Sequence, residues 1–214
     1  MAIETTRPRV HVREGTEADL AQIVPLYIAS LATIFPETNL SAEPGYAPHR
    51  VRRVLRSRLF APPPRLMRTY VVEVISTGEI VAFAHIVSKW DPEVASALRA
   101  RQPGISEREL DRKLENDLDE LDMFYVKVGA WGRGYGMLLM ETIKYVWCED
   151  SPAVKLLVYE RNERAIRFYE RHGFRRAAGR DVLIRSLLQL TEPRDDVFHL
   201  MCWRIMDEII GDRA

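Results

Sequence analysis

The chain has 214 residues, enough for one large domain with an insertion or for one domain with a small appendage. Its composition, 47% hydrophobic and 29% charged, is that of a globular protein and excludes a disordered chain, a collagen-like chain and a coiled-coil rod. Lys and Arg together number 31, as do Asp and Glu, so no overall field attracts the protein to nucleic acid or to an anionic membrane.

The two cysteines, Cys148 and Cys202, are too few for a disulfide framework or for a zinc site made of thiolates. They fit a reducing compartment, where buried thiols act as small hydrophobic side chains. The N-terminus has no apolar run of signal-peptide length, and no apolar stretch is long enough to cross a bilayer. These features predict a soluble, cytoplasmic protein with no membrane partner and no metal.

The first elements predicted are a strand and a helix. Apolar residues alternate over residues 9–14, as in a strand, and Thr16 with Asp19 three residues later is typical of a helix start. Apolar residues then recur at helical spacing over residues 20–34. Pro25 removes one backbone hydrogen bond inside this pattern, so we expect either a kink or a late helix start.

Residues 49–60 form a short basic segment without acids, which contains Arg50, Arg52, Arg53, Arg56 and Arg58. An apolar stripe predicts that it is an amphipathic helix, and the stripe consists of Val51, Val54, Leu55 and Leu59. Two interpretations stay open, an anion-binding face and a solvated helix face. Nucleic-acid binding is disfavoured, because the net charge is zero and no aromatic residues alternate with the arginines.

A hairpin is predicted next, with strands over residues 69–75 and 79–90 joined by the turn 76–78. His85 lies in the second strand. We interpret a lone strand histidine as a core or edge residue and not as a zinc ligand, since no second histidine has metal-ligand spacing to it.

A helical insertion is predicted at approximately residues 91–120. Ser106 and Glu109 form a capping-box start, and leucines continue from there at helical spacing. Residues 106–122 contain eight acids and three bases, a net charge of −5. The segment is either a solvated surface helix or an electrostatic lure for a cationic substrate.

Three alternating glycines, Gly132, Gly134 and Gly136, mark the most informative segment. Residues 123–128 before them have the composition of a strand, and an amphipathic helix follows. This order aims free backbone N–H groups and the positive end of a helix at one point, which suits a phosphate or pyrophosphate. The spacing matches neither the Walker loop nor the dinucleotide fingerprint, whose third glycine would be Met137.

A second strand is predicted over residues 154–159, followed by a helix that Asn162 opens and Gly173 ends. Together with the glycine loop, this segment resembles the GNAT superfamily of acyl-CoA-dependent N-acetyltransferases. The family's loop pattern, Gln/Arg-x-x-Gly-x-Gly/Ala, corresponds to residues 131–136. Its later pattern N-x-x-A-x-x-x-Y-x-x-x-G-F is matched by Asn162, Ala165, Tyr169, Gly173 and Phe174.

The resemblance implies a single domain over residues 1–214 with an α+β fold. A mostly antiparallel twisted sheet would be split between its fourth and fifth strands, flanked by helices, and carry the 91–120 insertion. Residues 196–205 predict the final strand, in which Cys202 is a packing residue and not a nucleophile. The protein would be a monomer or a homodimer.

The resemblance also implies acetyl-CoA as the acyl donor. Its pantetheine arm would pair with the backbone of Val126 and Val128. The other implied contacts come from the loop and the later helix: Trp131, Gly132, Arg133, Gly134, Tyr135, Gly136, Met137 and Asn162. Trp131 stands where the family usually has Gln or Arg, so one side-chain contact to the pyrophosphate is lost, and Arg133 is the candidate to replace its charge.

Direct attack of an amine on a thioester needs three groups. By resemblance, the N–H of Val126 stabilises an oxyanion and Tyr169 donates a proton to the leaving thiolate. Glu120 and Asp122 are two residues apart on a strand and share a face. The resemblance places that face toward the acceptor amine, so either would accept the proton of the attacking ammonium. The alternatives are a packed aromatic for Tyr169 and a solvated acid cluster for the carboxylates. Glu160 is a weaker candidate for the base.

These inferences predict an N-acetyltransferase acting on a primary amine of a small molecule or peptide, a cationic one if the acidic insertion is a lure. The alternative is a non-catalytic acyl-CoA-binding sensor or regulatory module, which Trp131 keeps open. The sequence does not identify the acceptor.

Overall fold

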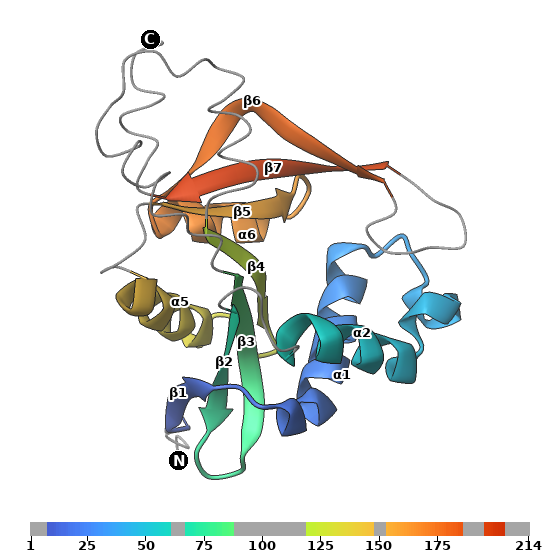
Figure 1. Cartoon of the computed structure of the whole chain (residues 1–214), viewed down its shortest axis with the longest axis vertical. Coiled ribbons are helices and arrows are strands. Elements are labelled where there is room, and N and C mark those ends of the chain that lie inside the picture. The colour runs from blue at the N-terminus through green and yellow to red at the C-terminus, as the bar shows by residue number, and fades with distance from the viewer. Residues whose placement is uncertain (1–7, 61–66, 88–118, 148–152, 186–194, 204–214) are drawn as a thin grey trace, which may run out of the picture.

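Seven strands form one twisted sheet in the computed structural model, which describes residues 8–60, 67–87, 119–147, 153–185 and 195–203 (Figure 1). Their order across the sheet is β1-β2-β3-β4-β5-β7-β6. The strands are β1 (Val10–Glu14), β2 (Met67–Val74), β3 (Glu79–Val87), β4 (Asp119–Val126), β5 (Val154–Tyr159), β6 (Phe174–Arg185) and β7 (Asp195–Trp203). Every neighbouring pair is antiparallel except β4 and β5, which confirms the expected mostly antiparallel sheet.

The sheet is split where β4 and β5 part, as expected. Two residue pairs join these strands, Asp119 with Val154 and Glu120 with Lys155. β5 is paired along its whole length with β7 on its other side. Figure 1 shows the result, with β2, β3 and β4 at a steep angle to β5, β6 and β7. Beyond Glu120, the facing backbone edges of β4 and β5 are therefore not paired with each other.

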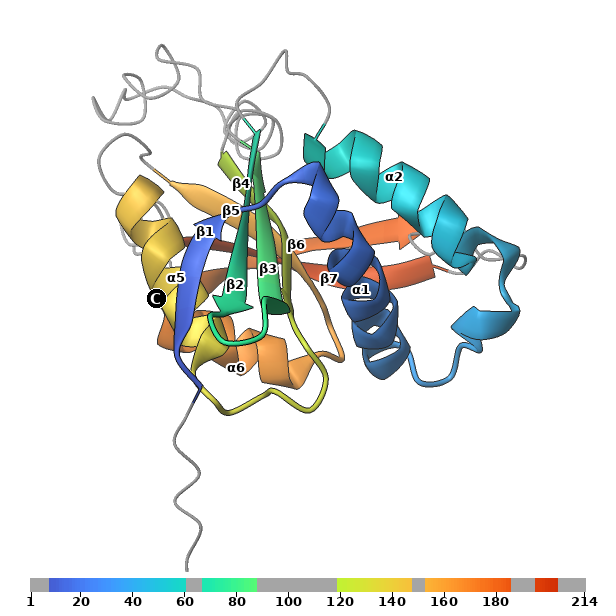
Figure 2. The ribbon, with the colours of Figure 1, turned by 90° about the horizontal axis from the view of Figure 1, so that it is seen from below.

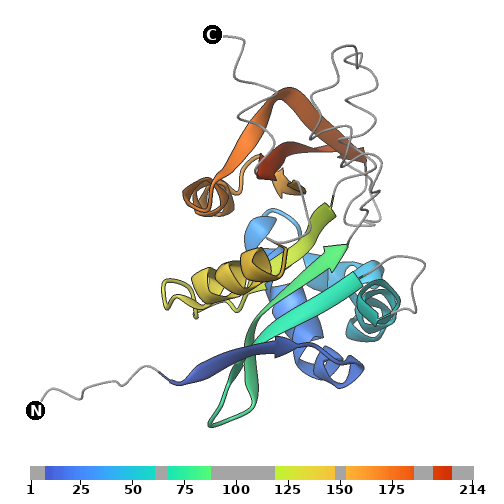
Figure 3. The same cartoon turned by 60° about the vertical axis from the view of Figure 1, so that its left-hand side comes forward.

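Helices cover both faces of the sheet, as Figure 2 shows. α1 (Leu20–Ile34) and α2 (Pro48–Phe60) lie on one face, and α5 (Tyr135–Trp147) and α6 (Glu163–Arg171) on the other. Figure 3 shows α5 against the β1–β4 part of the sheet and α6 beside β6. Short 3-10 helices precede and follow α1: η1 (Glu17–Asp19), η2 (Leu40–Ala42) and η3 (Pro44–Tyr46).

Two apolar cores result from the alternation of side chains along β3. Phe83 packs with α1 and α2, whereas Ala82 and Ala84 pack against Leu139 of α5. Successive strand residues point to opposite faces, so neighbours in β3 belong to different cores. No helix in the described part of the chain has the length and apolar character needed to span a bilayer.

The predicted elements that fall on described residues are confirmed in type, with the following corrections to their bounds and faces. α1 begins at Leu20 and continues through Pro25, so a late helix start is wrong, and the helix accommodates the missing N–H in its second turn. Val54 is 48% exposed and does not belong to the buried stripe of α2. β4 begins at Asp119, so the last two residues of the predicted insertion belong to the sheet; residues 91–118 lie outside the described ranges.

Both predictions for buried single residues in strands are confirmed. Cys202 is fully buried in β7, while Cys148 lies outside the described residues. His85 is also fully buried, and its Nδ1 lies 3.1 Å from the Thr69 hydroxyl, which donates to the carbonyl of Leu59 at 3.3 Å. A hydroxyl has one hydrogen, so while Thr69 donates to Leu59 it accepts a hydrogen bond from Nδ1 of His85. Nε2 has no partner among the described residues, and burial lowers the pKa of the ring.

An ion pair fastens β1 to the start of α1 and to β2. Arg13 donates two hydrogen bonds of 2.8 Å to Asp19 and one of 2.5 Å to Glu73. Asp19 also accepts from the N–H of Thr16 at 2.7 Å as part of a capping box, which confirms the helix start predicted at Thr16. The hydrogen bond from Arg13 lowers the pKa of Asp19 against the opposing effect of burial.

Replacing Asp19 with Asn is expected to lower the free energy of unfolding by about 1 kcal/mol at pH 7, since Arg13 loses a charged acceptor. The folded pKa of Asp19 lies below its ordinary value of 3.8, so its contribution is complete above that pH and is lost as the pH falls further. Urea unfolding at pH 7 and at about pH 3 should therefore show a smaller difference from wild type at the lower pH.

The matched control is Glu17→Gln, which breaks an exposed pair with Arg56. It should change stability by less than about 0.5 kcal/mol. Equal losses in the two variants would contradict the role assigned to Asp19.

Candidate active site

The glycine loop joins the end of β4 to the start of α5. Gly132 and Gly134 have φ angles of 75° and 88°, which residues other than glycine rarely adopt. A Cβ at either position would point into open space, so the loop presents bare backbone. A Cβ at Gly136 would instead lie 3.3 Å from the side chain of Val126, so this glycine lets α5 approach β4. The loop can therefore present N–H groups at the N-terminal end of α5 to an anion.

The end of β4 turns backbone groups toward the split. The N–H of Lys127 donates to the carbonyl of Val81 at 2.8 Å, so Lys127 is hydrogen-bonded to β3. Bonding direction alternates along an antiparallel pair, so Val126, which lies opposite Ala82, directs its N–H and C=O away from β3. These are the groups expected to pair with pantetheine. Val128 lies beyond the strand and is 40% exposed.

A cavity of about 670 Å³ extends from the glycine loop along the end of β4 and α6 to the C-terminal half of α1. The predicted cofactor-binding residues that line it are Val126, Trp131, Gly132, Gly134, Tyr135, Gly136, Met137 and Asn162. Val128 and Arg133 do not line it. The lining also includes residues that no sequence pattern had identified: Ser30, Thr33 and Ile34 of α1, Phe124 and Tyr125 of β4, and Arg164 of α6.

Tyr169 of α6 lies in the wall of this cavity. Its ring is packed between Phe124 and Phe174, at centroid distances of 6.2 and 5.7 Å. The residue is only 8% exposed, and its hydroxyl has no hydrogen-bond partner among the described residues. Burial raises the pKa of Tyr169 above its usual 10, so the hydroxyl is protonated at neutral pH and can donate.

Asn162 caps the N-terminus of α6, as predicted. Its Oδ1 accepts from the N–H of Ala165 at 3.2 Å, which leaves the side-chain NH₂ group for the cavity. Gly173, with φ of 83°, follows the other end of the helix. Glu160, the weaker candidate base, lies before the cap, 3.7 Å from the guanidinium of Arg161.

Trp131 folds back onto β4. Its indole N–H donates to the carbonyl of Val126 at 2.9 Å. The Cζ atom of Arg164 lies 3.9 Å from the centre of the indole ring. One of the two Val126 groups expected to meet pantetheine is therefore engaged by Trp131, and the cation beside the loop comes from α6. Arg133, the expected replacement, is exposed and outside the cavity wall.

Each predicted general base is next to a cation, and neither lines the cavity. Asp122 accepts two hydrogen bonds, of 2.8 and 2.5 Å, from Arg58 of α2. Burial lowers the pKa of Arg58, but the hydrogen bonds to Asp122 and the charge of this carboxylate, with smaller effects of Tyr27 and Tyr125, together raise it. Glu120 lies 3.9 Å from Nζ of Lys155 on β5. The role of either acid as a base stays a prediction.

A β-bulge accounts for the position of Asp122. His85 pairs with Met123 and Ile86 with Leu121, so Asp122 is the extra residue on β4. A bulge changes where a side chain is directed, and here the carboxylate reaches α2. Within the described ranges, no group of three or more His, Cys, Asp and Glu residues is placed to hold a metal ion.

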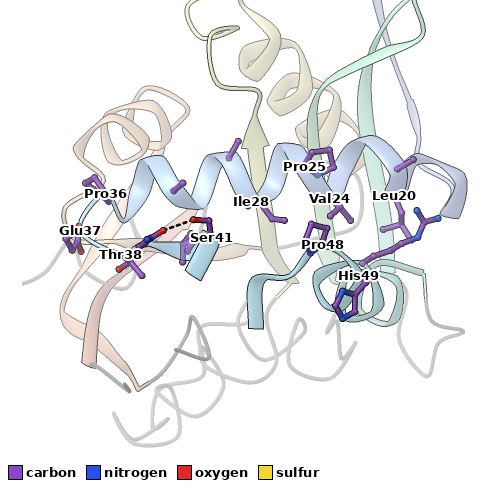
Figure 4. A pocket seen from close by; sticks show the side chains of 16 residues that line it. Leu20, Val24, Pro25, Ile28, Pro36, Glu37, Thr38, Ser41, Pro48 and His49 are labelled. Carbon is purple, nitrogen blue, oxygen red and sulfur yellow. Dashed lines mark hydrogen bonds between the residues drawn. The ribbon is translucent and has the colours of Figure 1, made fainter. Parts of the chain in front are cut away.

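A larger hollow, of about 980 Å³, lies on the outer side of α1 (Figure 4). Val24, Ile28 and Pro48 lie along it, and beside them the Ser41 hydroxyl donates to Asn39 Oδ1 at 2.7 Å. None of the predicted site residues lines this hollow. Size alone therefore does not locate the active site, and the smaller cavity at the glycine loop is the candidate.

The family model for the acetyltransferase (GNAT) family matches residues 31–174. The chain therefore belongs to this family, whose chemistry is acyl transfer. No curated protein matches the chain in sequence.

Solved structures are similar in fold. A GCN5-related N-acetyltransferase from Kribbella flavida shares 20% identity at a TM-score of 0.56, covering 90% of this chain and 96% of that one. PaiA N-acetyltransferase from Thermoplasma acidophilum, in complex with coenzyme A, shares 13% at 0.55, covering 91% and 98%. A chimeric spermidine N-acetyltransferase from Vibrio cholerae shares 14% at 0.55, covering 94% and 98%. At these identities the likeness shows the fold alone.

Coenzyme A at about 100 times its Kd is expected to stabilise the protein by roughly 2.7 kcal/mol, because only the folded loop binds it. Gly134→Val should abolish this shift, since the new side chain would fill the open space at the loop. Gly78→Val is the matched control: Gly78 also has a positive φ, of 68°, and open space, but lies in the β2–β3 turn. Thermal melts with and without ligand compare the two, and a full shift in Gly134→Val would exclude the loop as the site.

Proposed function

We propose that this protein is an N-acetyltransferase that transfers an acetyl group from acetyl-CoA to a primary amine of a small molecule or peptide, by direct attack of the amine on the thioester. One observation carries the proposal: a single cavity joins the glycine loop, the backbone of Val126 and the protonated hydroxyl of Tyr169. Family membership supports acyl transfer in general, and a relative in complex with coenzyme A supports a CoA thioester as donor.

The residues at the loop fit an acyl-CoA. Gly132 and Gly134 leave open space that a Cβ would fill, next to the N-terminus of α5, as a pyrophosphate requires. The N–H and C=O of Val126 suit the amide groups of a pantetheine arm, once Trp131 releases the carbonyl. When bound, the thioester supplies the activated acyl group.

Two groups of this chain assist the chemistry in the proposal. The N–H of Val126 stabilises the negative charge that develops on the carbonyl oxygen. Tyr169 donates a proton to the leaving sulfur, whose thiol has an ordinary pKa of about 8.5. Because burial raises the pKa of Tyr169, the proton is on the hydroxyl at neutral pH.

Tyr169→Phe is expected to lower kcat by about 10²–10⁴-fold, the usual cost of losing a general acid, with little change in the Kd for acetyl-CoA. Steady-state kinetics and a separate binding titration measure the two quantities. Tyr27→Phe removes a hydroxyl from a tyrosine of α1 that does not line the cavity, and it should keep wild-type turnover. Wild-type turnover in Tyr169→Phe as well would make Tyr169 a packing residue.

The proposed base is one of the two acids of β4. An alkylammonium has a pKa near 10 and must lose a proton before it attacks. Both oxygens of Asp122 accept hydrogen bonds from Arg58, so each is already engaged while the pair is closed. Glu120 lies 3.9 Å from Nζ of Lys155, a longer contact than those between Asp122 and Arg58, and we take it as the better candidate.

Glu120→Gln is therefore expected to lower the rate by about 100-fold near neutral pH and to recover in part at high pH, where free amine is abundant. Asp122→Asn should show a smaller version of the same profile. The pH–rate profiles of both variants on one amine test this assignment. Profiles parallel to that of the wild type would exclude both acids as the base.

The engaged carbonyl of Val126 favours a second candidate function, a non-catalytic acyl-CoA-binding sensor. In that case Trp131 would be a permanent part of the wall and the donor would bind without reacting. Release of CoA thiol from acetyl-CoA, followed across a panel of amines and peptides by mass shift, separates the two functions. Turnover with any acceptor contradicts the sensor, and tight binding with no turnover across the panel supports it.

A further inference from the structure

We propose that Arg164 is the side chain that binds the pyrophosphate of the acyl donor, and that Trp131 is the platform that positions it. The proposal rests on the proposed function, because it assigns a residue to the phosphate-bearing end of the same cavity. It makes Arg164 a specificity-determining residue, which favours CoA thioesters over pantetheine thioesters without phosphate.

Arg164 is a cation without an acidic partner in the described part of the chain. Its neighbours Arg161 and Arg167 contact Glu160 at 3.7 Å and Glu163 at 2.9 Å. Arg164 makes no such contact with any described residue, although it lines the cavity. Burial lowers its pKa, and no carboxylate raises it again. The cavity wall therefore carries an uncompensated positive charge.

The position of Arg164 in α6 makes its positive charge less favourable still. It is the second residue of the helix that begins at Glu163, and the first turn of a helix already carries a partial positive charge. A cation there is unfavourable for the helix, and Glu163, the acid of the same turn, contacts Arg167 at 2.9 Å. A bound pyrophosphate would remove both the helix penalty and the missing ion pair.

Trp131 holds the guanidinium next to the glycine loop. The distance of 3.9 Å from Cζ to the ring centre is a stacking contact, which fixes the plane of the guanidinium and leaves the N–H groups at its edges free. Trp131 is itself anchored to the carbonyl of Val126. A planar guanidinium can donate to two phosphate oxygens at once. The Trp131–Arg164 pair thus restores the contact that is lost when Trp131 replaces Gln or Arg.

Two other arginines are less suitable. Arg133 belongs to the loop but does not line the cavity. Arg171 lines the cavity near the other end of α6, about 10 Å from Arg164 along the helix axis, and it has no contact with Trp131. Among the described residues, Arg164 and Arg171 line the cavity without an acidic partner, and Arg164 is the one in contact with Trp131 of the loop.

The test compares Kd values, measured by titration calorimetry, for CoA, inorganic pyrophosphate and S-acetylpantetheine. Arg164→Ala should bind CoA and pyrophosphate about 10- to 100-fold more weakly and S-acetylpantetheine as the wild type does. Arg164→Lys should recover part of the loss, since it keeps the charge but not the planar fork. Arg167→Ala, on the same helix and outside the cavity, should match the wild type. Thermal melts confirm that each variant is folded.

If Arg164→Ala binds CoA as tightly as Arg167→Ala does, the proposal for Arg164 is wrong, and the proposed acyl-CoA site is not affected by that result. Equal losses for CoA and S-acetylpantetheine would also overturn it, because Arg164 would then shape the cavity and not bind phosphate. Failure of the wild type to bind CoA is a different result, which would refute the proposed function and this assignment with it.

Discussion

The short pairing between β4 and β5 is the constraint on which the candidate site depends. A parallel pair that continued past Glu120 would satisfy the backbone of Val126 and leave no room beside it. β5 instead pairs fully with β7, so the sheet stays continuous while the end of β4 turns its polar edge toward α6. A buried carbonyl needs a donor, and Trp131 supplies one. The split between β4 and β5 thus explains why a tryptophan is useful at position 131: it donates to a carbonyl that no strand of the described sheet pairs with.

The local parts of this arrangement were predictable from the sequence, because few residue types satisfy the conformations they require. Positive φ at Gly132 and Gly134 favours glycine, and the start of α6 needs a side-chain acceptor such as that of Asn162. Hydrophobic periodicity then predicted the strands and helices on either side. Strand, loop and helix could therefore be placed in order before their positions in space were known.

Contacts between distant segments could not be predicted in this way. Arg58 is 64 positions from Asp122, and the bulge that turns this carboxylate toward α2 leaves no mark in the spacing of Glu120 and Asp122. The contribution of α1 to the cavity wall could not be predicted from the sequence either. Ser30 and Thr33 bond their hydroxyls to carbonyls of their own helix, so they have the pattern of ordinary helical residues.

His85 makes the stability of the α2 side of the sheet depend on pH. The pKa of His85 in the folded protein lies below the ordinary value of 6.5, so the unfolded chain binds a proton at a higher pH than the folded chain does. The free energy of unfolding therefore decreases as the pH falls below 6.5. A proton on Nε2 would place a positive charge in the core, attracted by Asp122 and repelled by Arg58. Acid is therefore expected to destabilise the region where α2, β3 and β4 meet, which hydrogen exchange at decreasing pH would reveal.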